Sequence, residues 1–325
     1  MAAAVFEKGS FTATIFDAPA SASPPKPLLI ASPTEEGEYS VLVLFHGFLL
    51  HNTYYRELLK HVASHGYILV APQLYWVCSS NEIEDACAVL SWLSQGLQSS
   101  LPTNVKANTL NLALAGHSRG GRAAFLIALG KAANTPAISI KLLIGIDPVA
   151  GSSANMQLPP PILTFQPRSF DLQGTPVMVI GTGLGSEKKN CLFPACAPAG
   201  VNHQEFYNEC QPPCFHLVAT DYGHMDMLDD PTGIIQKMGY CMCVCGKNTE
   251  AMRRFVGGMM VAFLQAYLDD DQTDNDHLKA ILSDPSIAPV KVDPIEYIEK
   301  EEAKKAKFEA VMPQYPARPK TMQLI

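Results

Sequence analysis

Residues 110–128 have the sequence LNLALAGHSRGGRAAFLIA, and this stretch decides the fold. The run from Leu110 to Ala115 is mostly apolar, which predicts a strand buried on both faces of a sheet. Gly116–Gly121 forms a sharp turn, and the apolar spacing over residues 122–131 predicts a helix. A strand, a glycine-rich turn and a helix therefore follow one another, with Ser118 in the turn.

The turn itself matches the Gly-x-Ser-x-Gly pattern of a nucleophile elbow, as Gly-His-Ser-Arg-Gly over residues 116–120. A pentapeptide alone is weak evidence, but this one lies between a strand and a helix, where the motif has to lie to present a serine. Its glycines avoid Cβ clashes in a strained turn, and the helix N-terminus favours a developing oxyanion. We therefore expect Ser118 to be the nucleophile of an ester hydrolase with the α/β-hydrolase fold.

Strand and helix patterns alternate along the rest of the chain. We expect further strands at residues 26–31 (a first edge strand), 39–45, 67–71, 141–146, 176–181 and 215–219, and helices at 54–65, 81–97 and 250–268. This alternation predicts a mostly parallel central sheet with helices on both faces. Two stretches rich in Pro, Asn, Gln or Cys, 151–174 and 185–213, are expected to be irregular, lid-like insertions.

The composition predicts one catalytic domain with short extensions. Residues 1–25 are rich in Ala, Ser and Pro, which favours a flexible arm, and residues 26–298 carry the strand and helix patterns. Residues 299–325 form a charged tail, in which 299–309 are expected to be an exposed helix. A single α/β domain of this length is ordinary.

Charge and hydropathy exclude several classes of protein. The net charge is −7 and no Lys/Arg-rich block is present, which argues against a nucleic-acid partner. No apolar run approaches the length that spans a bilayer. The N-terminus lacks the apolar stretch of a signal peptide, and its low arginine content makes it a weak transit peptide.

The chain has nine cysteines, and an odd number in an intracellular protein favours mostly free thiols. Three of them fall in the Cys-Met-Cys-Val-Cys run over residues 241–245. This run lacks the two-residue gap with which paired cysteines wrap one zinc ion, and no histidine lies nearby. We expect loop thiols or a local disulfide here, and no metal.

Ester hydrolysis needs two backbone N–H donors for the oxyanion. One is expected from Arg119, the residue after the nucleophile, and the second from Phe48, in the His46–Leu49 loop that follows the strand at 39–45. We expect the side chain of His46 to be structural and to fix this loop.

The general base is expected after the last strand, downstream of the nucleophile and the acid. That order leaves His203, His216 and His224 of the nine histidines, whereas His117 points the wrong way for its neighbour Ser118. His216 falls inside the strand at 215–219. His224 lies just beyond that strand in a glycine-containing loop, and we predict that it is the base.

The acid is the least determined member of the triad. The commonest position is the end of the strand at 176–181, but that strand leads into Gly-Thr-Gly without an Asp, and Glu187 is the nearest carboxylate. The preceding strand ends in Ile146-Asp147-Pro148, which puts a carboxylate at the edge of the sheet. We favour Asp147 over Glu187, although Asp-Pro also commonly starts turns. Such a triad needs no cofactor.

Longer segments of the chain resemble plant chlorophyllases. The matching segments are His65–Leu74, Gly116–Gly121, Ile144–Ala150, Gly181–Gly185, Ala195–Pro198, Asn202–Phe206, Asp221–Asp230 and Met252–Gly258. The resemblance spans residues 26–298. It implies a serine esterase that hydrolyses the phytyl ester of chlorophyll to chlorophyllide and phytol, with Ser118, Asp147 and His224 as its catalytic triad.

The resemblance also implies a lipophilic substrate and a location. We expect Leu49, Phe165 and Met225 to contact chlorophyll in an apolar cleft, and peripheral association with a membrane, without a stable anchor or an obligate protein partner. The resemblance implies a chloroplast protein. Some family members reside elsewhere, and the cytosol or an endomembrane surface is therefore the alternative. The competing functions are a general lipase or polyester-type esterase on short acyl esters and a catalytically silent binding protein.

Overall fold

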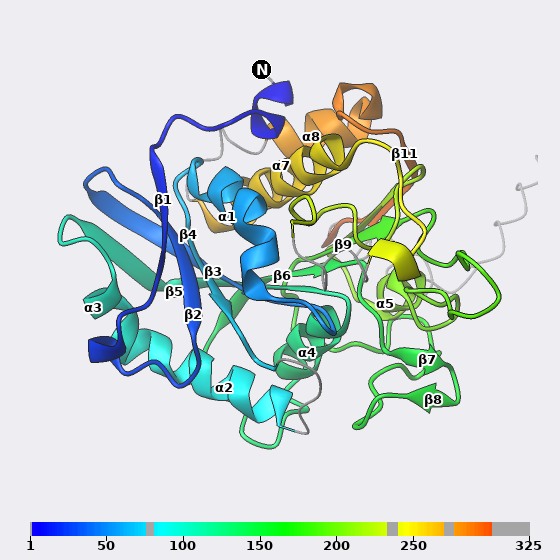
Figure 1. The fold of residues 1–325 in the computed structure, drawn as a ribbon, viewed down its shortest axis with the longest axis horizontal. Coiled ribbons are helices and arrows are strands. Elements are labelled where there is room, and N and C mark those ends of the chain that lie inside the picture. The colour runs from blue at the N-terminus through cyan, green and yellow to red at the C-terminus, as the bar shows by residue number, and fades with distance from the viewer. Residues whose placement is uncertain (1, 76–80, 233–239, 270–275, 301–325) are drawn as a thin grey trace, which may run out of the picture.

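A nine-stranded sheet runs through the centre of the computed structural model, within the part of the chain that the structure describes (Figure 1). The described residues are 2–75, 81–232, 240–269 and 276–300. The order of the strands is β1-β2-β4-β3-β5-β6-β9-β10-β11. The bounds are β1 Ala13–Asp17, β2 Leu28–Pro33, β3 Gly37–Phe45, β4 Ile68–Pro72, β5 Val105–His117, β6 Ile140–Ile146, β9 Val177–Thr182, β10 Cys214–Ala219 and β11 Val292–Ile298.

The centre of this sheet is parallel and its edges are antiparallel. The strands from β4 through β3, β5, β6 and β9 to β10 pair in parallel. At one edge β2 and β1 run antiparallel, and at the other β11 runs antiparallel to β10. This arrangement is consistent with the α/β-hydrolase fold predicted from the elbow motif. Its consequence is that the loops after β3, β5, β6, β9 and β10 all emerge at one edge of the sheet.

Helices cover both faces. The helical elements are η1 Ala2–Phe6, η2 Ala20–Ala22, η3 Asn52–Tyr55, α1 Arg56–Ala63, α2 Glu82–Trp92, η4 Leu93–Leu97, α3 Gln98–Ser100, α4 Arg119–Ala128, α5 His203–Glu209, α7 Thr249–Leu268, α8 Asp276–Ser283 and η6 Pro285–Ile287. Residues that alternate along each strand divide between two cores, so that Leu42 packs towards α1 and α7 while Val43 packs towards α2 and α4. Figure 1 shows these two helical layers on either side of the strands.

The expected central strands and long helices are present, with shifted ends. Strand β5 begins at Val105, five residues before the expected Leu110, because Val105–Asn108 pair with the start of β3 before a register shift. Helix α4 begins at Arg119, directly after Ser118. The two irregular insertions contain small elements: a β7–β8 hairpin (Gly151–Ser153 and Met156–Gln157) and α5. Strands β1 and β11 and helix α8 were not predicted.

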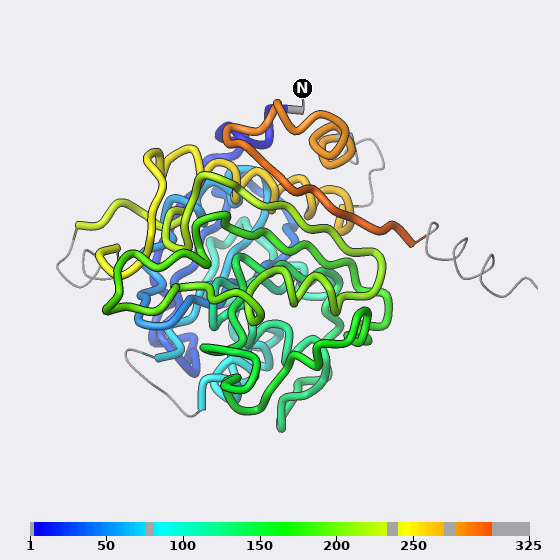
Figure 2. The backbone as a smooth tube through the Cα atoms, turned by 90° about the vertical axis from the view of Figure 1, so that its right-hand side faces the viewer, coloured from blue at the N-terminus to red at the C-terminus, as the bar shows by residue number. Residues whose placement is uncertain are grey.

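The expectation of a flexible arm over residues 1–25 is wrong for its described part. Val5 and Phe6 are buried, and the Phe6 ring stacks on Phe255 of α7 with centroids 6.4 Å apart. Strand β1 pairs with β2, so β2 is not the edge strand that was predicted near residues 26–31. Figure 2 shows this N-terminal segment beside the C-terminal helices. Two apolar residues in an Ala-rich stretch give no periodic signal, yet they complete the core.

The division into a catalytic domain over 26–298 and a tail from 299 stays a prediction, and residues 301–325 lie outside the described residues. The described helices include none that is both long enough and apolar enough to cross a membrane.

Three buried histidines and one half-buried histidine, His61, make the fold sensitive to acid. Burial lowers the pKa of His46, His61 and His216 to about 4 and that of His117 to about 3. Their pKa in the unfolded chain is about 6.5, so the unfolded chain takes up protons first as the pH falls. Their contribution to stability is therefore complete above pH 6.5 and is lost as the pH falls towards 4.

We expect the free energy of unfolding in urea to fall by ~2 kcal/mol for each of these histidines between pH 7 and pH 5. His61→Gln keeps a donor for the carbonyl of Val5, which His61 Nε2 contacts at 2.8 Å, but does not titrate. This variant should therefore lose less stability between the two pH values than the parent protein. Equal losses in both proteins would contradict the assignment of His61 as neutral in the folded protein.

Candidate active site

Ser118 lies between the last residue of β5 and the first residue of α4, with a strained backbone at φ 57° and ψ −124°. The flanking glycines are required by close approaches. A Cβ on Gly116 would lie 2.2 Å from the carbonyl oxygen of Gly120, and one on Gly120 would lie 2.3 Å from that of Phe45. The Ser118 amide donates to the carbonyl of Ile146 at 3.0 Å, which ties the elbow to the neighbouring strand.

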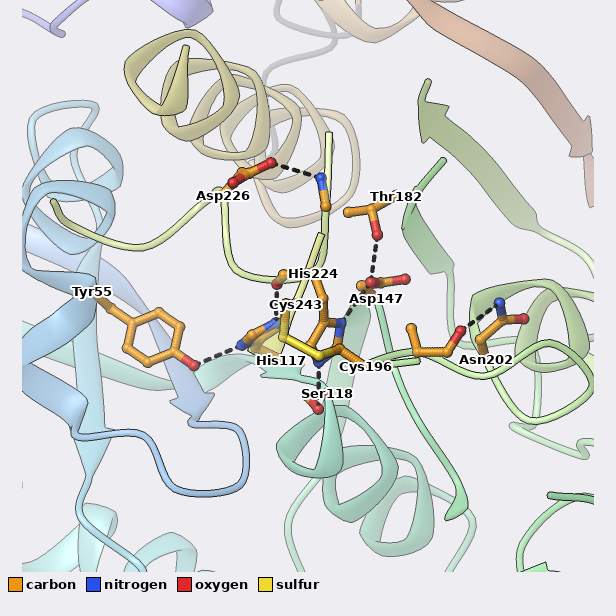
Figure 3. Close-up of polar contacts among 12 residues, drawn as sticks. Tyr55, His117, Ser118, Asp147, Thr182, Cys196, Asn202, His224, Asp226 and Cys243 are labelled. Atoms are coloured by element: carbon orange, nitrogen blue, oxygen red, sulfur yellow. Dashed lines mark hydrogen bonds and ion pairs between the residues drawn. A yellow bond between two sulfur atoms is a disulfide. The ribbon is translucent and has the colours of Figure 1, made fainter. Parts of the chain in front are cut away.

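The three predicted triad residues are brought together at the carboxyl ends of the strands (Figure 3). The Oγ of Ser118 lies 2.8 Å from Nε2 of His224, and the opposite ring nitrogen, Nδ1, lies 2.6 Å from Oδ2 of Asp147. A carboxylate accepts hydrogen bonds, so Nδ1 carries the imidazole hydrogen and Nε2 accepts from the serine hydroxyl. All three side chains are buried, which strengthens these contacts.

Asp147 follows β6 and is itself held by a neighbour. The hydroxyl of Thr182, at the end of β9, donates to Asp147 Oδ2 at 2.6 Å. Burial alone would raise the pKa of Asp147, but the hydrogen bonds from His224 and Thr182 and the electrostatic influence of the His224 and His203 rings lower it below its usual value. The carboxylate is thus kept ionised. Glu187, the alternative acid, is exposed on the following loop.

The competing histidines are engaged with each other. His203 Nδ1 lies 2.8 Å from His216 Nε2, and His216 Nδ1 lies 2.8 Å from a carboxylate oxygen of Glu296 on β11. Nδ1 of His216 therefore donates to the carboxylate, and its Nε2 accepts from His203. Neither ring contacts Ser118 in the described hydrogen bonds, which leaves His224 as the histidine next to the serine.

The loop after β3 packs against Ser118. A Cβ on Gly47 would lie 3.1 Å from the Cβ of Ser118, so any larger residue would crowd the serine and the loop would have to shift. His46 fixes the loop, as expected: its Nδ1 donates to the carbonyl of Gly47 at 2.8 Å, and its Nε2 accepts from the amide of Leu74 at 3.0 Å. Phe48, whose backbone amide is the predicted oxyanion donor, is the next residue of this loop.

Arg119 joins the elbow to the same loop through its side chain. The guanidinium lies over the ring of Phe48 at 5.8 Å and over the ring of Tyr75 at 5.2 Å. It also forms an ion pair with Glu82 on α2, with 2.5 Å between Nε and Oε2. The two predicted oxyanion donors, Phe48 and Arg119, therefore lie on segments that touch each other beside Ser118. Their role as donors stays a prediction.

Comparison with known proteins identifies the family. A sequence model described as chlorophyllase matches residues 1–299. The chain belongs to the chlorophyllase family. It is 54% identical over 256 residues to chlorophyllase-2 of Arabidopsis thaliana, covering 78% of this chain and 80% of that protein. It is 49% identical over 280 residues to chlorophyllase-1 of Arabidopsis thaliana (84% and 85%) and 45% identical over 289 residues to chloroplastic chlorophyllase-1 of Citrus unshiu (86% and 83%). As a member of this family the chain is a carboxylic ester hydrolase.

In this chlorophyllase-family protein the loop that carries His224 is clamped at its base. Asp226 Oδ2 accepts from the amides of Gly223 and Gly246, each at 2.6 Å. The backbone approaches closely here, since a Cβ on Gly223 would lie 1.8 Å from the carbonyl oxygen of Val244. The carboxylate therefore joins the base loop to the segment that contains the Cys241–Cys245 run.

A disulfide extends this clamp to the second insertion. Cys243 is bonded to Cys196, 47 residues away, so the cysteine run contributes to a long-range cross-link instead of a local one (Figure 3). The insertion in turn returns to the acid, because the amide of Ala197 donates to the carbonyl of Gly185, and a Cβ on Gly185 would lie 2.9 Å from Asp147 Oδ2. The other described cysteines are free, and Cys78 lies outside the described residues.

The residues predicted to contact substrate are scattered. Met225 follows His224 and is buried, whereas Leu49 is exposed on the loop after Phe48 with φ 58°. Phe165 is exposed on the first insertion, and its amide donates to Glu209 at the far end of α5, 2.6 Å away. None of the described hydrogen bonds joins Phe165 to the triad, and all three assignments stay predictions.

The cross-link predicts a large effect on stability. We expect the double variant Cys196→Ser, Cys243→Ser to lose about 4 kcal/mol of unfolding free energy in the chain-entropy description of a loop of this size. Ester turnover should fall as well, because the disulfide supports the segment clamped to the His224 loop. Denaturation curves and steady-state kinetics would measure both effects.

The matched control is Cys191→Ser, which changes an exposed free cysteine on the same insertion. It should leave both stability and turnover unchanged. A double variant as stable and as active as this control would contradict a supporting role for the disulfide.

Proposed function

We propose that Ser118, His224 and Asp147 hydrolyse the phytyl ester of chlorophyll to chlorophyllide and phytol. The observation that supports this most directly is the unbroken contact from Ser118 Oγ through His224 to Asp147, at 2.8 and 2.6 Å, in a chain of the chlorophyllase family. Hydrolysis of chlorophyll at this ester is the reaction of that family.

Acylation begins when Ser118 Oγ attacks the ester carbonyl carbon and His224 Nε2 takes up the serine proton. Asp147 holds the ring in the tautomer that leaves Nε2 free to accept that proton, and its negative charge stabilises the imidazolium that forms. The hydroxyl of Thr182 contributes by fixing the carboxylate at 2.6 Å. Nothing in this step requires a cofactor.

The tetrahedral oxyanion is then stabilised by the backbone amides of Phe48 and Arg119, with the N-terminus of α4 aimed at the same point. His224 returns its proton to the phytol oxygen, the C–O bond breaks and phytol leaves. A water molecule, deprotonated by His224, attacks the acyl-enzyme and releases the chlorophyllide carboxylate together with Ser118.

Substitutions test the role of Ser118 and distinguish between the two candidate carboxylates, Asp147 and Glu187. Ser118→Ala should abolish hydrolysis of chlorophyll while the protein stays folded, since the nucleophile is lost without a change in packing. Asp147→Asn should lower kcat by roughly 10⁴-fold because the imidazole tautomer is wrong. Glu187→Gln is the matched control and should keep normal turnover, as measured by chlorophyllide release.

A general esterase is the competing function. It would turn over short p-nitrophenyl esters well and chlorophyll negligibly, so kcat/KM for both substrates separates the two functions. A silent binding protein would hydrolyse neither ester, and the intact hydrogen-bonded triad argues against it.

We also propose that the enzyme meets chlorophyll at a lipid surface, by peripheral association and without an obligate protein partner. Phe48 and Leu49 expose apolar side chains on the loop beside Ser118. Leu192 and Phe193 do so on the insertion that the disulfide ties to the His224 segment. Apolar side chains exposed around a site for a lipophilic ester favour an interface over free solution.

We expect Leu192→Asp to weaken co-sedimentation with phosphatidylcholine–phosphatidylglycerol vesicles and to raise KM for vesicle-borne chlorophyll. Leu192 is 81% exposed, and Leu110, which is 80% exposed on β5, offers a matched control. Leu110→Asp should bind vesicles normally, and identical binding of the two variants would contradict docking through the insertion.

Some relatives are named chloroplastic, and we propose the chloroplast as the location of this chain. The cytosol or an endomembrane surface is the alternative, which a fluorescent fusion in leaf cells would reveal.

A further inference from the structure

A second chain of hydrogen bonds runs beside the triad and takes no part in the steps above. The amide of Gly47 lies 3.1 Å from the hydroxyl of Tyr55, which lies 2.8 Å from Nδ1 of His117. On the other side of the ring, Nε2 of His117 lies 2.9 Å from the backbone carbonyl oxygen of His224. Figure 3 shows Tyr55 and His117 in line towards the His224 segment.

The position of each hydrogen in this chain follows from its ends. A backbone amide only donates, so Tyr55 accepts from Gly47 and its own hydrogen is directed to Nδ1 of His117. A carbonyl only accepts, so Nε2 of His117 carries the ring hydrogen and donates it to His224. One neutral tautomer therefore satisfies every contact. Burial, the main cause, lowers the pKa of His117 to about 3 and raises that of Tyr55, so both groups stay uncharged at neutral pH.

The contacts join three segments that are distant in the sequence. Gly47 belongs to the loop after β3 and precedes Phe48, the proposed oxyanion donor. His117 is the last residue of β5 and precedes the nucleophile, and His224 is the base. Tyr55 is at the end of η3 and is 1% exposed, and the ring centroids of His117 and His224 are 4.7 Å apart. This series of hydrogen bonds thus extends from the oxyanion loop on one side of Ser118 to the His224 loop on the other.

We propose that Tyr55 and His117 are positioning residues that hold the oxyanion loop and the His224 loop at a fixed separation about Ser118. The proposal rests on the proposed function of Ser118 as nucleophile. In the described hydrogen bonds neither side chain binds a reacting atom. Tyr55 acts through the backbone of Gly47, and His117 acts through the backbone of His224 and through the His224 ring that it packs against. Ester hydrolysis depends on this separation because the donors and the base have to reach the same tetrahedral centre.

Tyr55→Phe removes the hydroxyl and keeps the ring. We expect kcat for chlorophyll to fall on the order of tenfold to a hundredfold, with KM nearly unchanged, because misplaced catalytic groups slow the chemical step more than substrate binding. The matched control is Tyr67→Phe, which also removes a tyrosine hydroxyl. That hydroxyl donates to Asp269 at a distance of 2.6 Å and does not belong to the triad. The control should lose similar thermal stability and keep its kcat.

Substitutions at His117 test the two halves of the bridge separately. His117→Gln places an amide donor near Nε2, within reach of the His224 carbonyl, and His117→Asn places an acceptor near Nδ1, within reach of Tyr55. His117→Leu offers neither. We expect the leucine variant to have the lowest kcat, and each amide variant to recover part of it.

The outcomes separate this proposal from the proposed function. Inactive Ser118→Ala together with a kcat of Tyr55→Phe within about twofold of the parent would refute the bridge alone. Equal kcat in the three His117 variants, or a fall in kcat that Tyr67→Phe shares, would assign these residues a merely structural role and also refute it. Turnover that survives Ser118→Ala would refute the nucleophile and, with it, the bridge.

Discussion

The backbone of Ser118, held at a positive φ, is the constraint on which the rest of the structure depends. The residue adopts this conformation because the glycines at 116 and 120 let β5, α4 and the end of β3 approach within contact distance. The hydrogen bond that the Ser118 amide donates to the carbonyl of Ile146 then places the elbow against β6, which is followed directly by Asp147. Ser118 and Asp147 are thus located by neighbouring strands, whereas His224 comes from a longer loop. That loop needs a carboxylate clamp and a cross-linked neighbour to hold it.

Histidine serves mainly as a structural residue in this protein. His46, His117 and His216 each use both ring nitrogens to join segments that are distant in the sequence, and burial keeps them neutral. A neutral imidazole suits this purpose because it offers one donor and one acceptor in fixed directions. His224 differs in that its second nitrogen faces a serine hydroxyl, a group that can give up its proton during the reaction. The chemistry of this histidine therefore depends on its neighbour as much as on its burial.

The sequence predicts the centre of the fold and the three side chains that meet at Ser118, for a local reason. Strands buried on both faces leave apolar runs, and the elbow leaves its own pattern between a strand and a helix, so residues 110–128 are recognisable without any partner. Edge strands such as β1 and β11 bury less and leave weaker patterns. Thr182, Asp226 and Tyr55 were missed because each acts through a polar contact with a distant segment. The one sequence feature that pointed to Thr182 was its position in Gly-Thr-Gly at 181–183, where the acid of a triad most commonly lies.

The packing of the first residues against α7 determines how far the N-terminus can be shortened without damage to the fold. Phe6 occupies the space that a side chain on Gly258 would fill, and its carbonyl accepts from Arg254. Removal of the chain up to the end of β1 would also remove Phe6 and would expose the apolar face of α7 that Phe6 covers. It would also leave the unpaired amides and carbonyls of β2 as a bare sheet edge, which invites aggregation. Cleavage or trimming downstream of Asp17 would therefore remove part of the folded domain.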